Sequence, residues 1–139
     1  MKKYLLNFST ESTNNIYAAG ISCTEPDYKL CWLLNNTLNT DLTKSDDIVI
    51  SNKDNTNDSF LLYKYIYDDI DLQLFLISNK NEGRILLDKL KNIDYIFVMK
   101  GIDADSQIFS KLKTIESISI IPFDISLQKK IETKLQMLE

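Results

Sequence analysis

The chain has 139 residues, a net charge of −4, 44% apolar residues and no histidine, a composition typical of one globular domain, which we expect to span residues 1–139. An acidic chain without a basic block is poorly suited to direct contact with nucleic acid or with an anionic membrane, because both need clustered lysine and arginine. The absence of histidine excludes Ser–His and Cys–His nucleophile pairs and metal sites that use histidine.

The sequence features that bear on location favour the cytoplasm. No stretch approaches the roughly 20 apolar residues of a membrane span, and the apolar run behind Lys2 and Lys3 is too short for a secretory signal. Cys23 and Cys31 are typical of ordinary reduced thiols. The three glycines lie far apart, so no phosphate-binding loop is predicted and we expect no cofactor.

The first third of the chain predicts two strands and a helix. A short strand is expected at residues 4–8 and a second at residues 16–23. Thr24 is predicted to cap a helix to about residue 38, with Pro26 in its first turn and Asp27 as the acid of a capping box. The apolar stripe of this helix is Leu30, Cys31, Leu34 and Leu38.

The middle of the chain predicts a hairpin. Its arms, residues 60–67 and 72–78, flank an acidic turn at residues 68–71. The pattern of residues 84–91 fits either a short helix or an extended segment. The other elements expected here are a short strand at 48–50, a polar surface loop at 51–59 and a turn at 79–83.

The run at residues 95–99 is apolar on both faces, which predicts a central, covered strand. Asp103 is expected to cap a helix to about residue 114, with Ile108, Phe109, Leu112 and Ile115 inward, and a last strand is expected at 118–123. Leu127, Ile131, Leu135 and Leu138 predict an amphipathic terminal helix. The order predicts an α+β fold: a largely antiparallel sheet of about six strands, with helices mainly on one face.

Three stretches together resemble a small family of uncharacterised bacterial proteins with the motif Ile-Pro-Glu-x-x-x-Val-Asp-Tyr: DYKLCWLLN (27–35), LFLISNK (74–80) and LKNIDYIFVMKG (90–101). Order and spacing match over nearly the whole chain. The motif positions here are Leu87, Asp88 and Lys89 for Ile-Pro-Glu, and Ile93, Asp94 and Tyr95 for Val-Asp-Tyr.

The motif is degenerate in this chain, because its Pro and Glu are both absent and Lys89 reverses the charge of the Glu. Asp88 suits the start of a short helical turn near residues 88–92. The resemblance implies no established activity. Genes of this family often neighbour those for ribonuclease III and pyruvate kinase, so the resemblance implies an association with RNA processing.

Asp94 and Tyr95 open the predicted central strand, and two interpretations stay open. They could place a carboxylate and a phenol at the mouth of a cleft, with Lys100 as a third group, although alternation puts Tyr95 and Lys100 on opposite faces. The expected alternative is structural: Asp94 caps a turn, and Tyr95 buries its ring with the hydroxyl bonded at the edge.

Aromatic residues offer two candidate contact surfaces. Tyr63, Tyr65 and Tyr67 alternate and share one face of a strand. Such a stripe could stack RNA bases, but basic neighbours are lacking, so a half-buried or protein-contact face is expected. Trp32 lies off the apolar stripe of its helix, where it is either drawn into a wide core face, which we favour, or exposed as a protein-contact anchor.

Two acidic segments, residues 68–71 and 103–105, could attract a cation. Neither continues as a calcium loop: in a loop that begins at Asp103, the sixth and twelfth positions are Ile108 and Thr114 in place of the Gly and Glu that calcium binding needs. Turns and helix caps are therefore expected, and no metal. Cys23 stands near a helix N-terminus but has no base beside it, so a buried thiol is expected.

The sequence therefore predicts a non-enzymatic cytoplasmic protein that binds another protein, or a copy of itself. The alternatives are an accessory factor in RNA processing or translation that contacts RNA or an RNA enzyme, and a small enzyme with an Asp/Tyr site.

Overall fold

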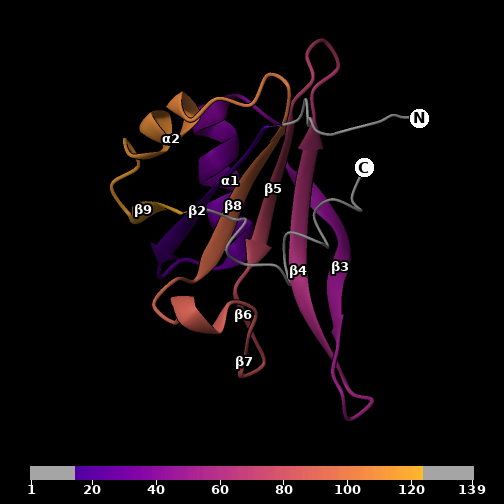
Figure 1. The fold of residues 1–139 in the computed structure, drawn as a ribbon. Helices are drawn as coiled ribbons and strands as arrows, with labels where there is room; N and C mark the ends of the chain where they lie inside the picture. The colour runs from indigo at the N-terminus through magenta and orange to yellow at the C-terminus, as the bar shows by residue number, and fades with distance from the viewer. Residues whose placement is uncertain (1–14, 124–139) are drawn as a thin grey trace, which may run out of the picture.

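A computed structural model describes residues 15–123, so the strand expected at residues 4–8 and the helix expected from residue 127 lie outside the described range. The described residues form a six-stranded antiparallel sheet, with strand order β3-β4-β5-β8-β2-β9, and two α-helices (Figure 1). This confirms the predicted α+β fold. The bounds are β2 (Asn15–Cys23), α1 (Asp27–Leu38), β3 (Thr43–Ser51), β4 (Asn57–Ile66), β5 (Gln73–Ser78), β8 (Tyr95–Gly101), α2 (Gln107–Leu112) and β9 (Ile118–Phe123).

β8 lies at the centre of the sheet, paired with β5 on one side and with β2 on the other. Ile96, Phe97, Val98 and Met99 are all fully buried. Because successive side chains of a strand point to opposite faces, burial of all four requires cover on both sides of the sheet. The prediction of a central strand in this apolar run is confirmed.

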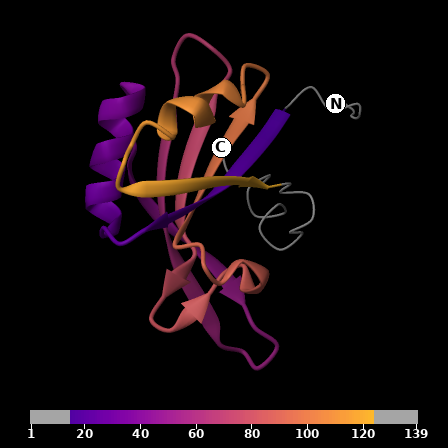
Figure 2. The ribbon, with the colours of Figure 1, turned by 90° about the vertical axis from the view of Figure 1, so that its left-hand side faces the viewer.

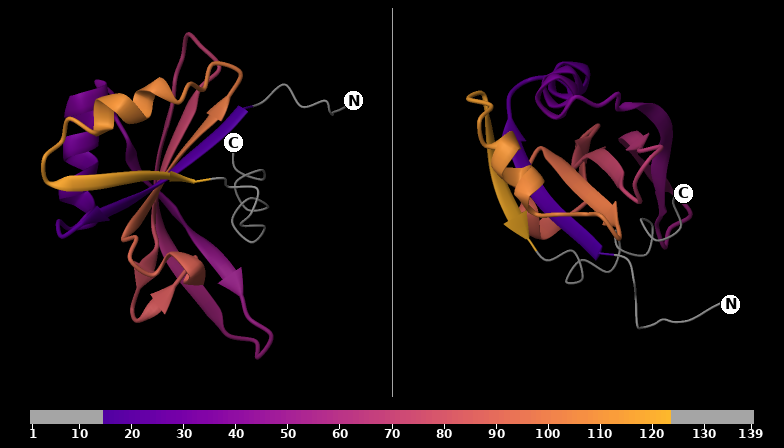
Figure 3. Two further views of the ribbon diagram at one scale, coloured as in Figure 1. Left: turned by 60° about the vertical axis from the view of Figure 1, so that its left-hand side comes forward. Right: turned by 90° about the horizontal axis from the view of Figure 1, so that it is seen from above.

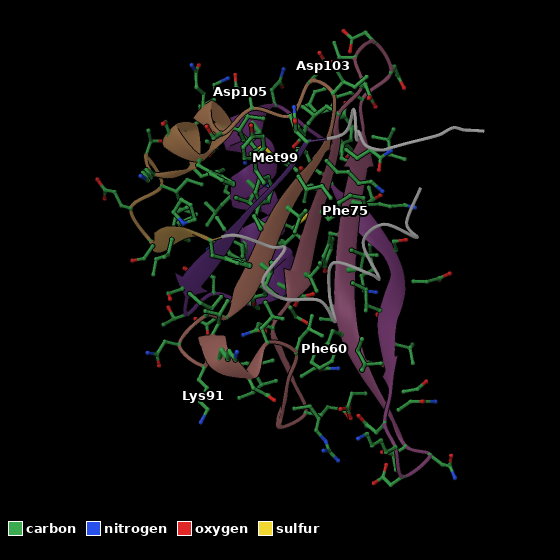
Figure 4. The ribbon with its side chains drawn as sticks, viewed as in Figure 1. Phe60, Phe75, Lys91, Met99, Asp103 and Asp105 are labelled. Atoms are coloured by element: carbon green, nitrogen blue, oxygen red, sulfur yellow. The ribbon has the colours of Figure 1, made fainter. Side chains whose placement is uncertain are left out.

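The two faces of the sheet carry separate apolar cores. One core contains side chains of α1 and α2 together with Phe97 and Met99 of β8. The other contains Ile96 and Val98, and it extends under Leu86 and Leu87. Figures 2 and 3 show α1 and α2 on the same side of the sheet. Figure 4 labels Met99, which belongs to the first core, and Phe60 and Phe75, which belong to the second.

Both helices begin later than the sequence suggested. α1 begins at Asp27 with Pro26 as its N-cap, and no side chain caps it. The expectation that Thr24 is the cap is wrong, because the Pro26 carbonyl already accepts the first helical bonds, from the N–H groups of Lys29 and Leu30. α2 begins after Ser106, not after Asp103.

Asp103 does not cap α2, because its carboxylate is bound elsewhere. It accepts the N–H of Asp71 at 2.7 Å, while the carboxylate of Asp71 accepts the N–H of Ile102 at 2.9 Å. The two acidic segments therefore bind each other's backbone at one end of the sheet, and Figure 4 shows Asp103 and Asp105 at that end. Asp105 accepts the N–H of Gln107 at 2.9 Å. These bonds agree with the turn interpretation of the carboxylates, whereas the cap expected at Asp103 is wrong, because Ser106 is the N-cap of α2 and its side chain makes no capping hydrogen bond.

The remaining differences are of length. β3 is longer than the expected strand at 48–50 and carries a bulge between Ser45 and Ile48, so the polar loop shrinks to a tight turn before Asn57. A small hairpin, β6 (Lys80–Asn81) and β7 (Arg84–Ile85), follows β5. The short 3₁₀ helix η2 (Asp88–Leu90) confirms the predicted helical turn. Within residues 15–123, no helix is long and apolar enough to cross a membrane.

Candidate functional site

A cleft of about 530 Å³ opens where β2 and β5 end and where α1 and β8 begin. Several antiparallel strands meet at this end of the sheet, so short links bring their polar flanking residues together. The lining residues are Cys23, Thr24, Glu25, Pro26, Asp27, Leu61, Ser78, Lys80, Asp94 and Tyr95.

Asp94 binds protein groups with both carboxylate oxygens. Oδ2 accepts the backbone N–H of Cys23 at 2.9 Å, and Oδ1 lies 3.2 Å from Nζ of Lys80. The backbone of Asp94 donates to the carbonyl of Ile21 and accepts from the N–H of Asn79. Asp94 thus joins the end of β2 to the link after β5, which agrees with the structural interpretation of this residue.

Two tyrosine hydroxyls anchor the segment that leads into α1. Tyr95 donates to the carbonyl of Glu25 at 2.9 Å, and Tyr63 donates to the carboxylate of Asp27 at 2.6 Å. Burial, then the charge of Asp27, raises the pKa of Tyr95 to about 12. Burial, then the hydrogen bond to Asp27, raises the pKa of Tyr63 as well. Both phenols stay protonated at neutral pH and their protons are engaged, so neither is suited to act as a base.

The two thiols are buried and protonated. Burial raises the pKa of Cys23, although its sulfur accepts the N–H of Glu25 at 3.3 Å. Burial also raises the pKa of Cys31, whose thiol donates to the carbonyl of Leu42. Because the thiolate is the reactive form, neither thiol is activated. Among residues 15–123, no group of three or more Cys, Asp or Glu side chains is arranged to hold a metal ion.

Lys100 does not join Asp94 and Tyr95. It lies at the other end of β8, opposite Gln73 and Ile16, whereas Tyr95 lies opposite Ser78 and Ile21. The lysine beside Asp94 is Lys80, which the sequence placed only in a turn. Lys80 directly follows the polar residue Asn79 at the end of β5, but the sequence gives no sign that this link folds back onto Asp94.

The motif segment is held by Asn79, which the sequence analysis did not single out. Asn79 is fully buried, and its side chain makes three hydrogen bonds. Nδ2 donates to the carbonyls of Leu90 and Ile93 at 3.0 and 2.9 Å, and Oδ1 accepts the N–H of Leu87 at 2.8 Å.

The motif positions are thereby arranged around Asn79. Leu87 and Ile93 are buried, Asp88 and Lys89 are exposed on η2, and Asp94 and Tyr95 line the cleft. The cluster that Asn79 organises closes a turn, and the hydrogen bonds of its side chain all go to backbone groups.

The tyrosine stripe faces the helix side of the sheet. Tyr63, Tyr65 and Tyr67 are partly buried against the core that contains α1 and α2. The rings of Tyr65 and Tyr67 meet edge to face, with centroids 4.9 Å apart. This matches the expected half-buried face and leaves little free ring surface for stacking bases.

Trp32 is exposed, which corrects the expectation that it is drawn into the core. Its side chain is 61% exposed, and Tyr28, one helical turn earlier, is 70% exposed. The core face of α1 is filled by Leu30, Cys31 and Leu34, which leaves no room for the indole on that side. Tyr28 was not among the predicted contact residues, although its spacing of four residues from Trp32 is a signal for a shared helix face.

Comparisons of the chain with protein-family models and with curated protein sequences found no match. The resemblance to the Ile-Pro-Glu-x-x-x-Val-Asp-Tyr family therefore stays a prediction from the motif positions.

Proposed function

We propose that this protein binds another protein through the outer face of α1, without catalysing a reaction. The observation that carries this proposal is the pair Tyr28 and Trp32, which are 70% and 61% exposed and lie on one helix face. Trp and Tyr are the side chains that most often anchor protein interfaces, because each buries a large apolar area at low cost in side-chain entropy.

The helix that presents this pair is firmly held. Leu30 and Leu34 are fully buried beneath it, and the Asp27–Tyr63 hydrogen bond fixes its first turn to β4. At its other end, Oδ1 of Asn35 accepts the N–H of Leu42 at 2.7 Å. A rigid helix loses little conformational entropy on binding, so the two rings form a preorganised contact surface.

The cleft beside α1 supports this proposal better than it supports catalysis. Asp94, Tyr95 and the Cys23 thiol in its lining are bound to protein groups, and the pKa shifts of Tyr95 and Cys23 favour their protonated forms. An active site needs a group free to take or give a proton, or an activated nucleophile. We assign the cleft contacts to the positioning of α1.

The RNA alternative has less support. Tyr63, Tyr65 and Tyr67 are partly buried on the helix side, and Asp68, Asp69 and Asp71 lie in the turn that follows them. Carboxylates at this position would repel phosphate. A cytoplasmic location is part of our proposal and is supported by two cysteines that are free thiols.

The test compares affinity purifications of the tagged full chain from its own cells. The wild type is compared with the double variant Tyr28→Ala/Trp32→Ala and with Val49→Ala, which removes an exposed apolar side chain from β3. We expect one stoichiometric partner protein with the wild type and with Val49→Ala, and loss of that partner with the double variant. Recovery of the partner by all three forms, or RNA above background in the same eluates without a partner protein, would contradict the proposal.

A further inference from the structure

The β9 edge of the sheet differs from the opposite edge in charge and in shape. β3, at the opposite edge, carries Lys44, Asp46 and Asp47 and a bulge, which are devices that discourage the pairing of another strand. β9 carries no charged residue over Ile118–Phe123, and Ile121 is 55% exposed. Among the described strands, β9 pairs only with β2, so no strand within residues 15–123 pairs with its other side.

Two apolar hollows lie beside the C-terminal end of β9, one on each face of the sheet, and both extend over the neighbouring strand β2. On the helix side, a hollow of about 370 Å³ is bounded by Tyr17, Phe109 and Pro122. On the other side, a hollow of about 210 Å³ is bounded by Leu90, Ile93 and Ile121. Figure 3 shows β9 at the margin of the sheet with α2 beside it.

The charge around both hollows has one sign. Lys113 lines the hollow on the helix side, and Lys89 and Lys91 line the other. Neither lining contains a carboxylate, although the chain as a whole has a net charge of −4. Figure 4 shows Lys91 at η2 extending away from the sheet. The linings of the two hollows therefore carry only positive charge, and the exposed carboxylates of Asp88, Asp105 and Glu116 on the neighbouring segments lie outside these linings.

We propose that the β9 edge binds an extended acidic segment of a partner protein, which adds to the sheet as a further strand. In this mode of recognition the backbone of the edge strand supplies hydrogen bonds, and hollows for alternate side chains supply specificity. Pro122 has no N–H and is tolerated where a strand edge is open, so backbone pairing is confined to residues 118–121.

The geometry defines the sequence of the bound segment. Consecutive side chains of a strand point to opposite faces, so two adjacent apolar residues enter the two hollows. Acidic residues before and after this pair then lie close to Lys89, Lys91 and Lys113. This inference rests on different residues from the α1 surface, so either can fail without the other.

The test uses a fluorescein-labelled peptide with Ile-Leu at its centre and three glutamates on each side, titrated with the full chain by fluorescence anisotropy. The protein variants are Lys89→Glu/Lys91→Glu, Lys113→Glu and the control Lys53→Glu, an exposed lysine in the turn between β3 and β4. A second peptide of the same sequence carries N-methyl groups on alternate backbone nitrogens, which removes hydrogen-bond donors without changing the protein.

We expect the peptide to bind the wild type, Lys53→Glu and Tyr28→Ala/Trp32→Ala alike. Lys89→Glu/Lys91→Glu should weaken binding about tenfold or more, as reversal of charge across an interface does, and Lys113→Glu should weaken it to a smaller extent. The N-methylated peptide should bind at least tenfold more weakly than its parent. No binding to the wild type, equal binding by the lysine variants, or equal affinity for the two peptides would overturn the proposal. A dimer of the wild type in analytical ultracentrifugation that excludes the peptide would assign the edge to a second copy and would also overturn it.

Discussion

The Asp94 carboxylate accepts a hydrogen bond from the Cys23 backbone N–H at 2.9 Å, across 71 positions of sequence. This bond joins the start of the central strand β8 to the end of β2, directly before the segment that leads into α1. The contact explains why an acidic residue stands at the entrance of an apolar strand without acting as a base. Because the bond holds the segment that leads into α1, the position of α1, and therefore of Trp32, also depends on the turn at Asp94.

Replacing Asp94 should therefore cost stability. Asp94→Ala leaves the partly buried Cys23 N–H without a partner, and we expect the free energy of unfolding to fall by about 1–3 kcal/mol. Lys80→Ala removes only the ion pair, whose lysine side chain is 43% exposed, and should change stability by less than about 0.5 kcal/mol. Urea unfolding of both variants measures the difference. Equal costs would show that the ion pair, and not the backbone bond, is what matters.

Asn79 should be more sensitive than Asp94. Asn79→Ala removes three hydrogen bonds from a fully buried side chain and takes their partner from the N–H of Leu87 and the carbonyl of Ile93, while the carbonyl of Leu90 keeps its bond from the N–H of Ile93. We expect a loss above about 2 kcal/mol, larger than that of Asp94→Ala. Asn92→Ala, on an exposed side chain two positions after Leu90, is the control and should be nearly neutral. A small effect at Asn79 would mean that η2 is held by its apolar contacts alone.

Gly101 and Gly83 form a matched pair for backbone strain. Both have positive φ, +133° and +81°, but only at Gly101 would an added Cβ overlap the carbonyl oxygen of Asp71. Gly83→Ala meets open space and should cost about 1–2 kcal/mol from its φ alone. Gly101→Ala should cost distinctly more, because the added Cβ would meet the backbone carbonyl of Asp71, which cannot move aside as a flexible side chain can. Thermal unfolding of the two variants distinguishes them, and similar midpoints would argue against the close approach of Asp71.

Stability should decline at high pH because folding raises the pKa of partly buried tyrosines, including Tyr67. Folding raises the pKa of Tyr95 from 10 to about 12 and also raises the pKa of Tyr63. Between these values the unfolded chain loses the phenolic proton while the folded chain keeps it, so the free energy of unfolding falls as pH rises through about 10 to 12. Tyr95→Phe removes the contribution of the Tyr95 phenol, so the free energy of unfolding of this variant should fall less steeply over this range. Urea titrations at several pH values test this, and parallel curves for wild type and variant would contradict it.

The fold could be predicted from the sequence where local pattern decides the structure. The apolar run of β8 and the strands at residues 16–23 and 118–123 agree with the structure because burial and alternation leave a clear pattern. Helix starts were less predictable. Thr24 and Asp103 are good capping residues, but Pro26 begins α1 with its own carbonyl and Asp103 is used by Asp71.

The candidate site was harder to predict because its contacts are long-range. The sequence singled out Asp94 and Tyr95, but their partners Cys23 and Glu25 lie on a different strand and loop. Asn79 looked like an ordinary turn residue, since nothing local shows that it lies within reach of Ile93. Trp32 was misplaced because the width of the buried face of a helix is set by its neighbours and not by its own sequence.

The most direct test of the α1 proposal uses the single tryptophan of the chain, Trp32, as the reporter. Its fluorescence is recorded while the purified partner protein, or a tryptophan-free variant of it, is added to the full chain. The account predicts a blue shift and protection from acrylamide quenching at the partner concentration where calorimetry shows the complex forming, because the exposed indole becomes buried. A complex that forms in the calorimeter while the emission and quenching of Trp32 stay unchanged would contradict the assignment of this face.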